Sequence, residues 1–265
     1  YKKGFTPWEW HDALFKKAKK LKITCFSSVF DESSVDFLEK FNVPAYKISS
    51  FESNHYPLIG RVIKTKKPII ISVGLNSLQE IKELLKFLKN NKCKNFALLK
   101  CTSSYPALPS DSNINTIKDM RKKFKCEVGL SDHTLGIGAS IAAVSNQATI
   151  IEKHFTLDKK SKGVDSKFSL NPSELSSLVK ESYIAWRSLG NIFYGPTKNE
   201  IKSLIFRRSI YIVKDINKNE FLTKKNIKVI RPGYGLHPKN YFKVLGKKIS
   251  KNCKKGEPLK LKNIY

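Results

Sequence analysis

The sequence predicts a parallel (β/α)8 barrel of the TIM type, followed by a small β-rich domain. Three observations predict this arrangement. Short apolar runs begin every 22 to 31 residues through the first 154 residues, amphipathic helical patterns lie between them, and helical periodicity almost disappears after residue 206. A chain of 265 residues, 40% of them hydrophobic, is long enough for one large domain and one small one.

The apolar runs are expected to be β-strands, because they are apolar nearly throughout, as strands covered on both faces are. They lie at residues 22–27, 45–50, 68–73, 96–101, 127–131 and 149–154. Amphipathic helical patterns lie at residues 34–41, 77–90 and 113–124. Strands that alternate with helices at this spacing predict βαβ units and a parallel sheet.

An open doubly wound sheet fits the same alternation, so the polar residues decide between the two folds. In five of the six runs they gather at the carboxyl end or just beyond it. A barrel brings all of these ends to one mouth, whereas an open sheet uses mainly those at its switch point. We therefore predict a barrel. Such a barrel has eight strands and about six βα units are present, so we expect the first two units to precede Tyr1.

The domain boundaries follow from changes in the pattern of predicted secondary structure along the chain. Residues 173–189 predict a closing helix with a serine N-cap, followed by Gly190. Residues 191–205 contain Gly and Pro and predict a linker. Residues 206–265 have short strands and frequent turns. We therefore predict an N-terminally truncated barrel at 1–190, a linker at 191–205 and a β-rich domain at 206–265.

The net charge of +28 raises the question of a polyanionic partner. Only six of the 50 basic residues are arginines, however, and the lysines are spread over the polar faces of the amphipathic stretches. Lysines on solvated helix faces are therefore the expected explanation of the charge, with a nucleic acid partner as the alternative.

The sequence contains no run of 18 apolar residues, so no membrane span is expected. Five cysteines without paired spacing are typical of reduced thiols in a cytoplasmic protein.

Two histidines each follow a predicted strand. His133 lies in GLSDHT (129–134) and His154 in EKHFT (152–156). Two imidazoles that meet at one barrel mouth are able to bind a divalent metal and leave positions open for substrate, with Asp132 or Lys153 orienting them. The alternative is two unrelated histidines near a loop.

Lys47 and Lys100 lie within otherwise apolar strands, where an unpaired charge costs several kcal/mol. A phosphate or carboxylate ligand would be a natural partner, and nearby hydroxyls would complete an anion site. These hydroxyls belong to Ser50, Ser72, Thr102, Ser103 and Ser131. The alternative is that each lysine reaches solvent or pairs with an acid such as Glu52.

Glu52 and Asp165 are candidate acids for a sugar hydroxyl or a proton, or else solvated surface groups.

Many motifs of the chain resemble the sialic acid synthase family, that is, N-acetylneuraminate synthases and their relatives. The resemblance rests on YKISSFES, PIIISVG, LLKCTSSYP, GLSDHTLG, EKHFTLD and GVDSKFSLNP, in this order. TPWEWH and FSSVFD are most similar to the pseudaminic acid synthase branch. RRSIYIVKDI, IRPGYGL and LGKK resemble the SAF, or antifreeze-like, domain that these enzymes carry.

The resemblance implies a barrel joined to a SAF domain in a domain-swapped homodimer. It implies the condensation of phosphoenolpyruvate with an acetamido sugar aldehyde, which releases phosphate and forms a nine-carbon ulosonic acid. It also implies a divalent metal, usually Mn²⁺, with Mg²⁺ or Co²⁺ as alternatives. A truncated, non-catalytic remnant whose SAF domain serves only binding or dimerisation is the competing hypothesis.

By residue match, His133 and His154 correspond to the metal ligands of the family. Lys47, Ser50, Ser72 and Ser131 match positions that hold phosphoenolpyruvate, and Glu52, Tyr105 and Asp165 match positions around the sugar and the metal-bound water. Arg231 matches an arginine that reaches from the SAF domain into the mouth of the neighbouring subunit. Ser103 departs from the asparagine of many sialic acid synthases, which suits a different sugar. The missing strands would supply a glutamate and a further lysine in relatives.

Overall fold

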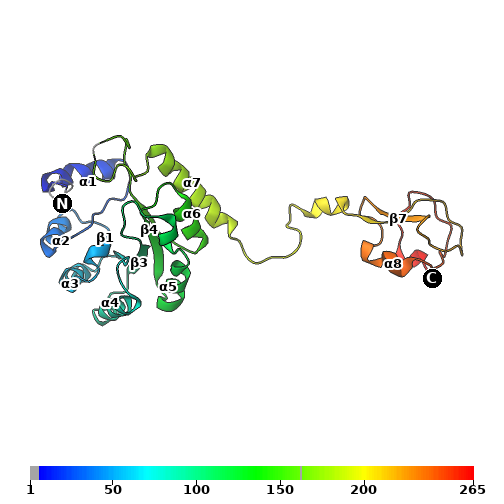
Figure 1. Ribbon diagram of the computed structural model, residues 1–265, viewed down its shortest axis with the longest axis horizontal. Helices are drawn as coiled ribbons and strands as arrows, with labels where there is room; N and C mark the ends of the chain where they lie inside the picture. The colour runs from blue at the N-terminus through cyan, green and yellow to red at the C-terminus, as the bar shows by residue number, and fades with distance from the viewer. Residues whose placement is uncertain (1–5, 162) are drawn as a thin grey trace. The chain divides into compact units, whose positions relative to one another are not determined.

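The computed structural model describes residues 6–161 and 163–265. The chain divides into two compact units, Tyr1–Gly190 and Asn191–Tyr265 (Figure 1). The first unit is an α/β unit with parallel strands, and the second is small and rich in short strands and turns. Each unit is therefore described by itself.

A curled sheet of five parallel strands forms the centre of the first unit (Figure 1). The strands are β1 (Tyr46–Ile48), β2 (Ile69–Ser72), β3 (Phe96–Cys101), β4 (Glu127–Asp132) and β5 (Ile151–Lys153). Their order in the sheet is their order in the sequence, so every crossover moves one strand in the same direction. This order belongs to a barrel wall and not to a doubly wound sheet, which confirms the predicted fold class.

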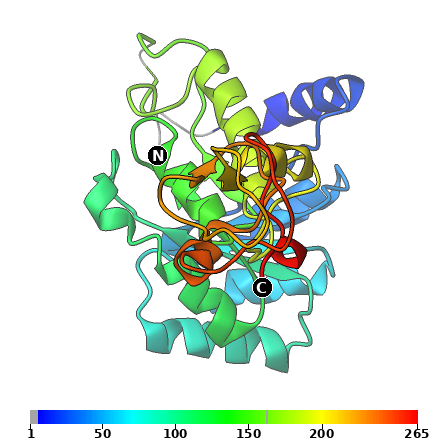
Figure 2. The same cartoon turned by 90° about the vertical axis from the view of Figure 1, so that its right-hand side faces the viewer.

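Helices cover the outer face of this sheet (Figures 1 and 2). They are α1 (His11–Lys20), α2 (Glu32–Glu39), α3 (Tyr56–Lys64), α4 (Leu78–Asn90), α5 (Thr116–Phe124), α6 (Gly138–Ser145) and α7 (Pro172–Ser188). Their apolar stripes pack on the strands, as Leu58 and Leu84 do against Ile69 and Ile71 in one buried core. Helix packing leaves the carboxyl ends of the strands accessible to a ligand.

Two predictions about individual elements are wrong. Residues 22–27 form no strand, and only Ser28 makes a bridge to Lys47 of β1. The apolar Ile23 of this run is exposed instead of packed, so the run lacks the burial that holds the other strands. The N-cap of α7 is Asn171 and not a serine: its side chain accepts the Glu174 N–H, and the Glu174 carboxylate accepts the Asn171 N–H.

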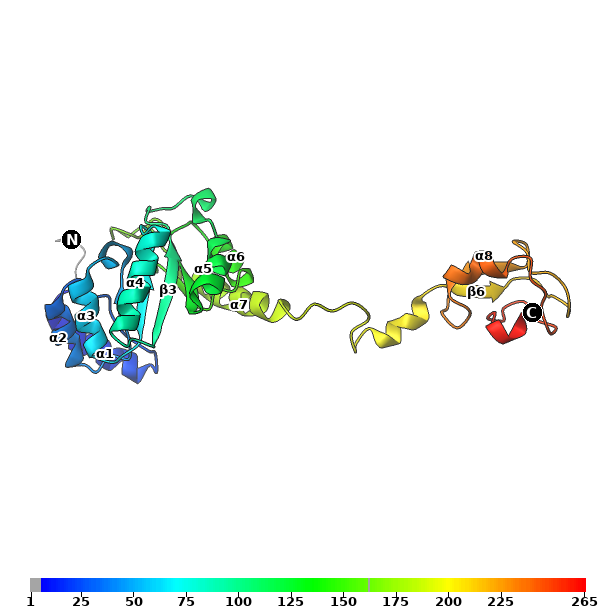
Figure 3. The ribbon, with the colours of Figure 1, turned by 90° about the horizontal axis from the view of Figure 1, so that it is seen from below.

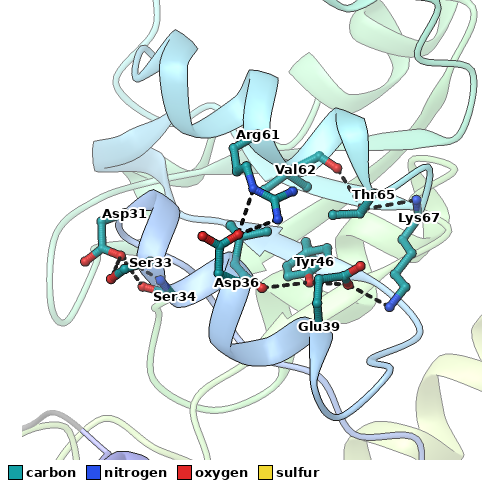
Figure 4. Close-up of polar contacts among 11 residues, drawn as sticks. Asp31, Ser33, Ser34, Asp36, Glu39, Tyr46, Arg61, Val62, Thr65 and Lys67 are labelled. Atoms are coloured by element: carbon teal, nitrogen blue, oxygen red, sulfur yellow. Dashed lines mark hydrogen bonds and ion pairs between the residues drawn. The ribbon is translucent and has the colours of Figure 1, made fainter.

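Polar contacts join α2 to α3 and to the residues at the start of β1 and β2 (Figure 4). The buried Tyr46 hydroxyl donates to Glu39 at 2.6 Å, and Lys67 Nζ lies 2.7 Å from the same oxygen. Arg61 of α3 pairs with Asp36 of α2. These contacts fix β1 and therefore the neighbouring Lys47.

Tyr46→Phe is expected to lower the free energy of unfolding by about 1 kcal/mol, because one buried hydrogen bond is lost. Urea denaturation measures this change, and Tyr56→Phe serves as the control. Although burial opposes it, hydrogen bonds from Lys67 and Tyr46 lower the pKa of Glu39 from its ordinary 4.5. The carboxylate therefore stabilises the fold above about pH 4.5 and loses this contribution as the pH falls through the lowered pKa. An unchanged free energy of unfolding in Tyr46→Phe would contradict the stabilising role of the hydrogen bond between Tyr46 and Glu39.

The second unit is built on the antiparallel pair β6 (Ser209–Ile212) and β7 (Ile227–Ile230), with the short helix α8 (Tyr241–Val244) (Figure 3). Isolated bridges from later residues extend this pair. Its core consists of Ile210, Ile212, Ile216, Leu222, Ile227, Val244, Ile249, Cys253 and Leu259. Among the described residues, no helix of either unit has the length and apolarity needed to cross a membrane.

Candidate active site

A hollow of about 480 Å³ lies at the carboxyl ends of the five strands. Eight of the residues singled out from the sequence line it: Lys47, Ser50, Ser72, Tyr105, Ser131, His133, His154 and Asp165. They come from all five strands or from the segments that follow them. The structure thus brings together side chains that are more than 100 residues apart in the sequence.

The two histidines both line this hollow, and their rings pack edge to face. Their ring centroids are 5.2 Å apart. Nδ1 of the buried His133 lies 2.8 Å from the Thr102 carbonyl oxygen, and Nδ1 of His154 lies 3.3 Å from the Asp165 carboxylate. Because these oxygens only accept, each Nδ1 carries a hydrogen, and in the neutral form of each ring Nε2 holds the lone pair. Both rings are thereby prepared as metal ligands through Nε2.

This donor set fits a divalent metal with open coordination positions. Within residues 6–161 and 163–265, no group of three or more His, Cys, Asp or Glu side chains is close enough to form a closed metal site. The protein would therefore supply two imidazoles, with Asp165 orienting His154. Such a site leaves positions for substrate oxygen and water, as catalytic sites require.

Aromatic rings pack around the imidazoles. Tyr105 lies 4.3 Å from His133 and 6.0 Å from His154, measured between ring centroids. Phe168 lies 5.0 Å from His154 and is buried. Sequence analysis did not single out Phe168, although this residue lies within the motif GVDSKFSLNP (163–172). These contacts restrict the rotation of both histidines.

Lys47 forms the other half of the site. Its buried Nζ donates to the Ile48 carbonyl and the Ser72 hydroxyl, both at 2.9 Å. Nζ also lies 3.6 Å from the Glu152 carboxylate. Burial lowers the pKa of Lys47, and the Glu152 charge opposes this shift. The lysine thus lines the hollow, and the Glu152 carboxylate is its ion-pair partner in the described part of the chain.

Glu152 is the main residue that sequence analysis missed. It accepts a hydrogen bond from Ser131 at 2.6 Å, beside its contact with Lys47. It is paired with Ser131 in the register of β4 and β5 and lies two residues before His154. Since alternate strand residues share a face, this spacing from His154 was the signal that could have found it.

Asp132 and Lys153 contact each other and neither imidazole. Their side chains are 1% and 2% exposed, and Lys153 Nζ lies 2.9 Å from the Asp132 carboxylate. Asp132 also accepts from the Ser140 hydroxyl of α6 and the Thr134 N–H. Although burial raises it, these hydrogen bonds lower the pKa of Asp132 overall. This buried pair joins β4 and β5 directly beside the two histidines.

Four of the predicted site residues do not line the hollow. Glu52 lies in a short 3₁₀ helix, accepts the Ser49 hydroxyl and has a pKa raised by burial. The Thr102 hydroxyl donates to the Asp111 carbonyl, and the backbone carbonyl of Thr102 accepts from His133 Nδ1. Ser103 Oγ lies 3.7 Å from Cys101 Sγ. Arg231 lies in the second unit.

For Lys100 the structure favours the alternative to an anion site. Its Nζ donates to the Cys101 carbonyl at 2.8 Å and to the Thr102 hydroxyl at 3.3 Å, and the residue is absent from the lining of the hollow. The reason is the alternation of β3: the next residue, Cys101, faces the hollow, so Lys100 points to the other side of the sheet.

Comparisons with known proteins find relatives that align with nearly the whole chain. Pseudaminic acid synthase of Campylobacter jejuni is 42% identical over 260 residues, which are 98% of this chain and 76% of that protein. Pseudaminic acid synthase of Helicobacter pylori is 39% identical over 266 residues, or 100% of this chain and 78% of that one. The N,N'-diacetyllegionaminic acid synthase of Campylobacter jejuni is 39% identical over 250 residues, with 93% and 75% covered.

Solved structures agree as well. A spore coat polysaccharide biosynthesis protein of Bacillus subtilis matches with a TM-score of 0.67 and 30% identity, over 98% of this chain and 78% of that chain. The N-acetylneuraminic acid synthetase of Leptospira borgpetersenii matches with a TM-score of 0.71 and 31% identity, over 75% and 70%. Residues 1–194 match the NeuB family and residues 207–264 match the SAF domain. The resemblance found in the motifs is therefore confirmed, and the chain belongs to the NeuB family and carries a SAF domain.

Proposed function

We propose that the protein is a synthase of the pseudaminic acid type, which condenses phosphoenolpyruvate with an acetamido sugar aldehyde to a nine-carbon ulosonic acid and releases phosphate. The observation that carries this proposal is the hollow, in which the buried Lys47 and the serine hydroxyls lie opposite two paired imidazoles. The names of the relatives support the same reaction class. A non-catalytic module would have no need of this arrangement.

Lys47 and the hydroxyls of Ser50, Ser72 and Ser131 form the proposed phosphoenolpyruvate subsite. They supply one cation and several neutral hydroxyls from β1, β2, β4 and the short 3₁₀ helix after β1, and these groups would hold the phosphate and carboxylate of the ligand. The π electron pair between carbons 2 and 3 of phosphoenolpyruvate then forms a bond from carbon 3 to the aldehyde carbon. The aldehyde oxygen takes up a proton and becomes a hydroxyl group, and carbon 2 is left cationic. Holding both reactants in one hollow removes much of the entropic barrier to this attack.

His133 and His154 would hold the divalent metal, which we propose is Mn²⁺, with Mg²⁺ or Co²⁺ as alternatives. When bound there, the metal supplies Lewis-acid polarisation of the aldehyde oxygen. We propose that Asp165 and Tyr105, which both line the hollow, contact the sugar, and that Glu52 is a further acid for it. A carboxylate takes one proton from the water that adds to carbon 2 of the donor, after which phosphate leaves.

The test of this proposal is a phosphate-release assay on the full-length protein. It contains phosphoenolpyruvate, MnCl₂ and 2,4-diacetamido-2,4,6-trideoxy-altrose, with N-acetylmannosamine as the comparison sugar. We expect stoichiometric phosphate release and a new ulosonic acid by mass spectrometry with the first sugar. No release with either sugar would overturn the proposed function.

Lys47→Met is expected to lower kcat/KM for phosphoenolpyruvate by about a hundredfold, because a hydrogen bond to a charged group contributes about 1.5 to 3 kcal/mol. The fold should keep most of its stability, since the Glu152 carboxylate that loses its partner is 40% exposed and remains solvated. Steady-state kinetics and a thermal melt measure the two effects.

Lys100→Met is the matched control for this change. It makes the same exchange at a partly buried lysine of β3 that points away from the hollow. We expect its kcat/KM to stay within about threefold of the parent, as for a substitution outside the site. Equal losses in the two variants would contradict the role given to Lys47.

We further propose that the protein works in the cytoplasm as a domain-swapped homodimer. Its five cysteines are all free thiols, which suits a reducing compartment. The end of α7 exposes Tyr183, Ile184, Trp186 and Leu189, an apolar surface of the kind that protein interfaces cover. Light scattering should give twice the chain mass of 30.2 kDa. A monomer at micromolar concentration would contradict the dimer.

A further inference from the structure

A second hollow of the first unit lies along α3. Its volume is about 980 Å³, compared with about 480 Å³ for the candidate active site, and the two share no lining residue. Since Leu58, Ile59 and Val62 are the buried residues of α3, this hollow lies on the side of the helix that faces away from the sheet. The residues of α3 that line it recur at helical spacing and are Tyr56, Pro57, Gly60, Arg61, Ile63 and Lys64.

Basic side chains dominate the lining of this hollow. Glu32 is the acidic residue of the lining, against six basic residues, which are Arg61, Lys64, Lys66, Lys67, Lys92 and Lys94. Two of the six have partners, since Arg61 pairs with Asp36 and Lys67 pairs with Glu39 (Figure 4). The other four are exposed lysines that make no ion pair with any described residue. Their charges are therefore available to a ligand.

The pairing of β2 with β3 brings the four unpaired lysines together. Ile69 is paired with Phe96 in the register, so the segments that precede the two strands, 64–67 and 92–95, lie side by side. Lys66 and Lys92 follow the ends of α3 and α4 with φ angles of 60° and 56°, a conformation that turns the chain out of a helix. Like charges at one end of a hollow repel one another, and a bound anion relieves this repulsion.

Gly60 leaves free space in the middle of the hollow. A glycine inside a helix lowers stability relative to alanine. Among the described residues, a Cβ at this position would meet the Phe87 ring at 3.7 Å, which is an ordinary contact, and the backbone does not have a positive φ. Packing therefore does not require glycine here. The partly buried Ile63, Phe87 and Cys93 line the same hollow with apolar atoms.

We propose that this hollow binds a nucleoside phosphate. The unpaired lysines match a group with several negative charges, and lysine is a common phosphate ligand. The apolar lining and the free space at Gly60 match a ring, which a nucleobase supplies and inorganic phosphate lacks. The volume is near the upper end of the range for small-molecule sites, which suits a ligand larger than phosphoenolpyruvate. The proposal does not rest on the synthase reaction, because no residue of the candidate active site enters it.

Binding of a fluorescent ATP analogue to the full chain tests the proposal. The assay contains EDTA, so that no divalent metal holds the nucleotide in the candidate active site. We expect saturable binding that ATP and CTP reverse, that tripolyphosphate and adenosine each reverse about tenfold less well, and that phosphoenolpyruvate does not reverse. Lys47→Met, which removes the cation of the candidate active site, should bind the analogue as the parent does.

Lysine variants separate this hollow from general charge attraction. Lys64→Gln and Lys92→Gln should each weaken the affinity for the analogue about fivefold, which corresponds to about 1 kcal/mol. Lys82→Gln is the matched control, because it removes the same charge from an exposed position on α4 outside the lining. Its affinity should equal that of the parent.

Glycine variants test the free space. Gly60→Met fills the space with a good helix former, so the fold should be kept while binding weakens about tenfold. Gly60→Ala controls for the gain in helix stability, because its methyl group would only make an ordinary contact with Phe87, and its affinity should stay within about threefold of the parent.

Five results would overturn the proposal. They are the absence of saturable binding, full affinity in Gly60→Met, and equal losses in Lys82→Gln and Lys64→Gln, which would indicate general charge attraction. Displacement by tripolyphosphate as effective as that by ATP would remove the nucleoside from the proposal, and displacement by phosphoenolpyruvate would place the analogue in the candidate active site. Displacement by single-stranded DNA and not by ATP would assign the lysines to a nucleic acid and would equally contradict the proposal.

Discussion

His133→Ala and His154→Ala are each expected to leave the purified protein without bound divalent metal. The reason is the small number of ligands: the hollow offers two imidazoles, and among the described residues no third His, Cys, Asp or Glu is close enough to complete a cluster. A single remaining imidazole would compete poorly with water for Mn²⁺. Elemental analysis after gel filtration with Mn²⁺ measures the effect independently of activity.

His55→Ala is the control, because this histidine is exposed and does not line the hollow. Asp165→Asn should give an intermediate result and weaken metal affinity by about 10- to 100-fold, as the loss of a partner that orients a ligand usually does. Full metal retention in both alanine variants would remove the basis for assigning the site.

Asp132→Asn is expected to destabilise the first unit by about 3 to 5 kcal/mol, because it leaves the ammonium group of Lys153 buried without a counter-charge. The asparagine keeps the size of the side chain and is able to accept the Thr134 N–H, so the effect isolates the charge. Urea denaturation followed by fluorescence measures the change.

The double variant Asp132→Leu with Lys153→Met provides the matched comparison. Replacing a whole buried ion pair by apolar side chains is often neutral, so this variant should recover most of the lost stability. If Asp132→Asn costs no more than an exposed substitution such as Asp119→Asn, the buried pair does not stabilise the fold. A recovery of stability with weaker metal binding would show that the pair also positions the histidines.

The strands and the histidine pair were accessible from the sequence for a simple physical reason. Apolar runs at regular spacing fix which segments are buried, and polar residues at their carboxyl ends fix where the mouth lies. His133 and His154 follow such runs directly and were found in this way. The run at 22–27 has the same composition, but Ile23 remains exposed, and composition alone does not contain that difference.

The partners of the charged residues were not accessible in the same way. Glu152 meets Lys47 and Ser131 because of the pairing between strands, and Lys100 faces away because of the alternation along β3. Both depend on register, which a list of motifs does not give. The pairing of Asp132 with Lys153 needs the same knowledge.

The carboxylate of Glu152 beside Lys47 has a consequence for selectivity. The Glu152 carboxylate competes with any incoming anion for the Lys47 ammonium group, so a ligand binds there only if its own contacts with the lysine are more favourable. Chloride, with one charge and no directional acceptors, gains too little to do so. A metabolite that bears two acidic groups engages the ammonium and the surrounding hydroxyls together, and the pocket thereby rejects the abundant small ions of its surroundings.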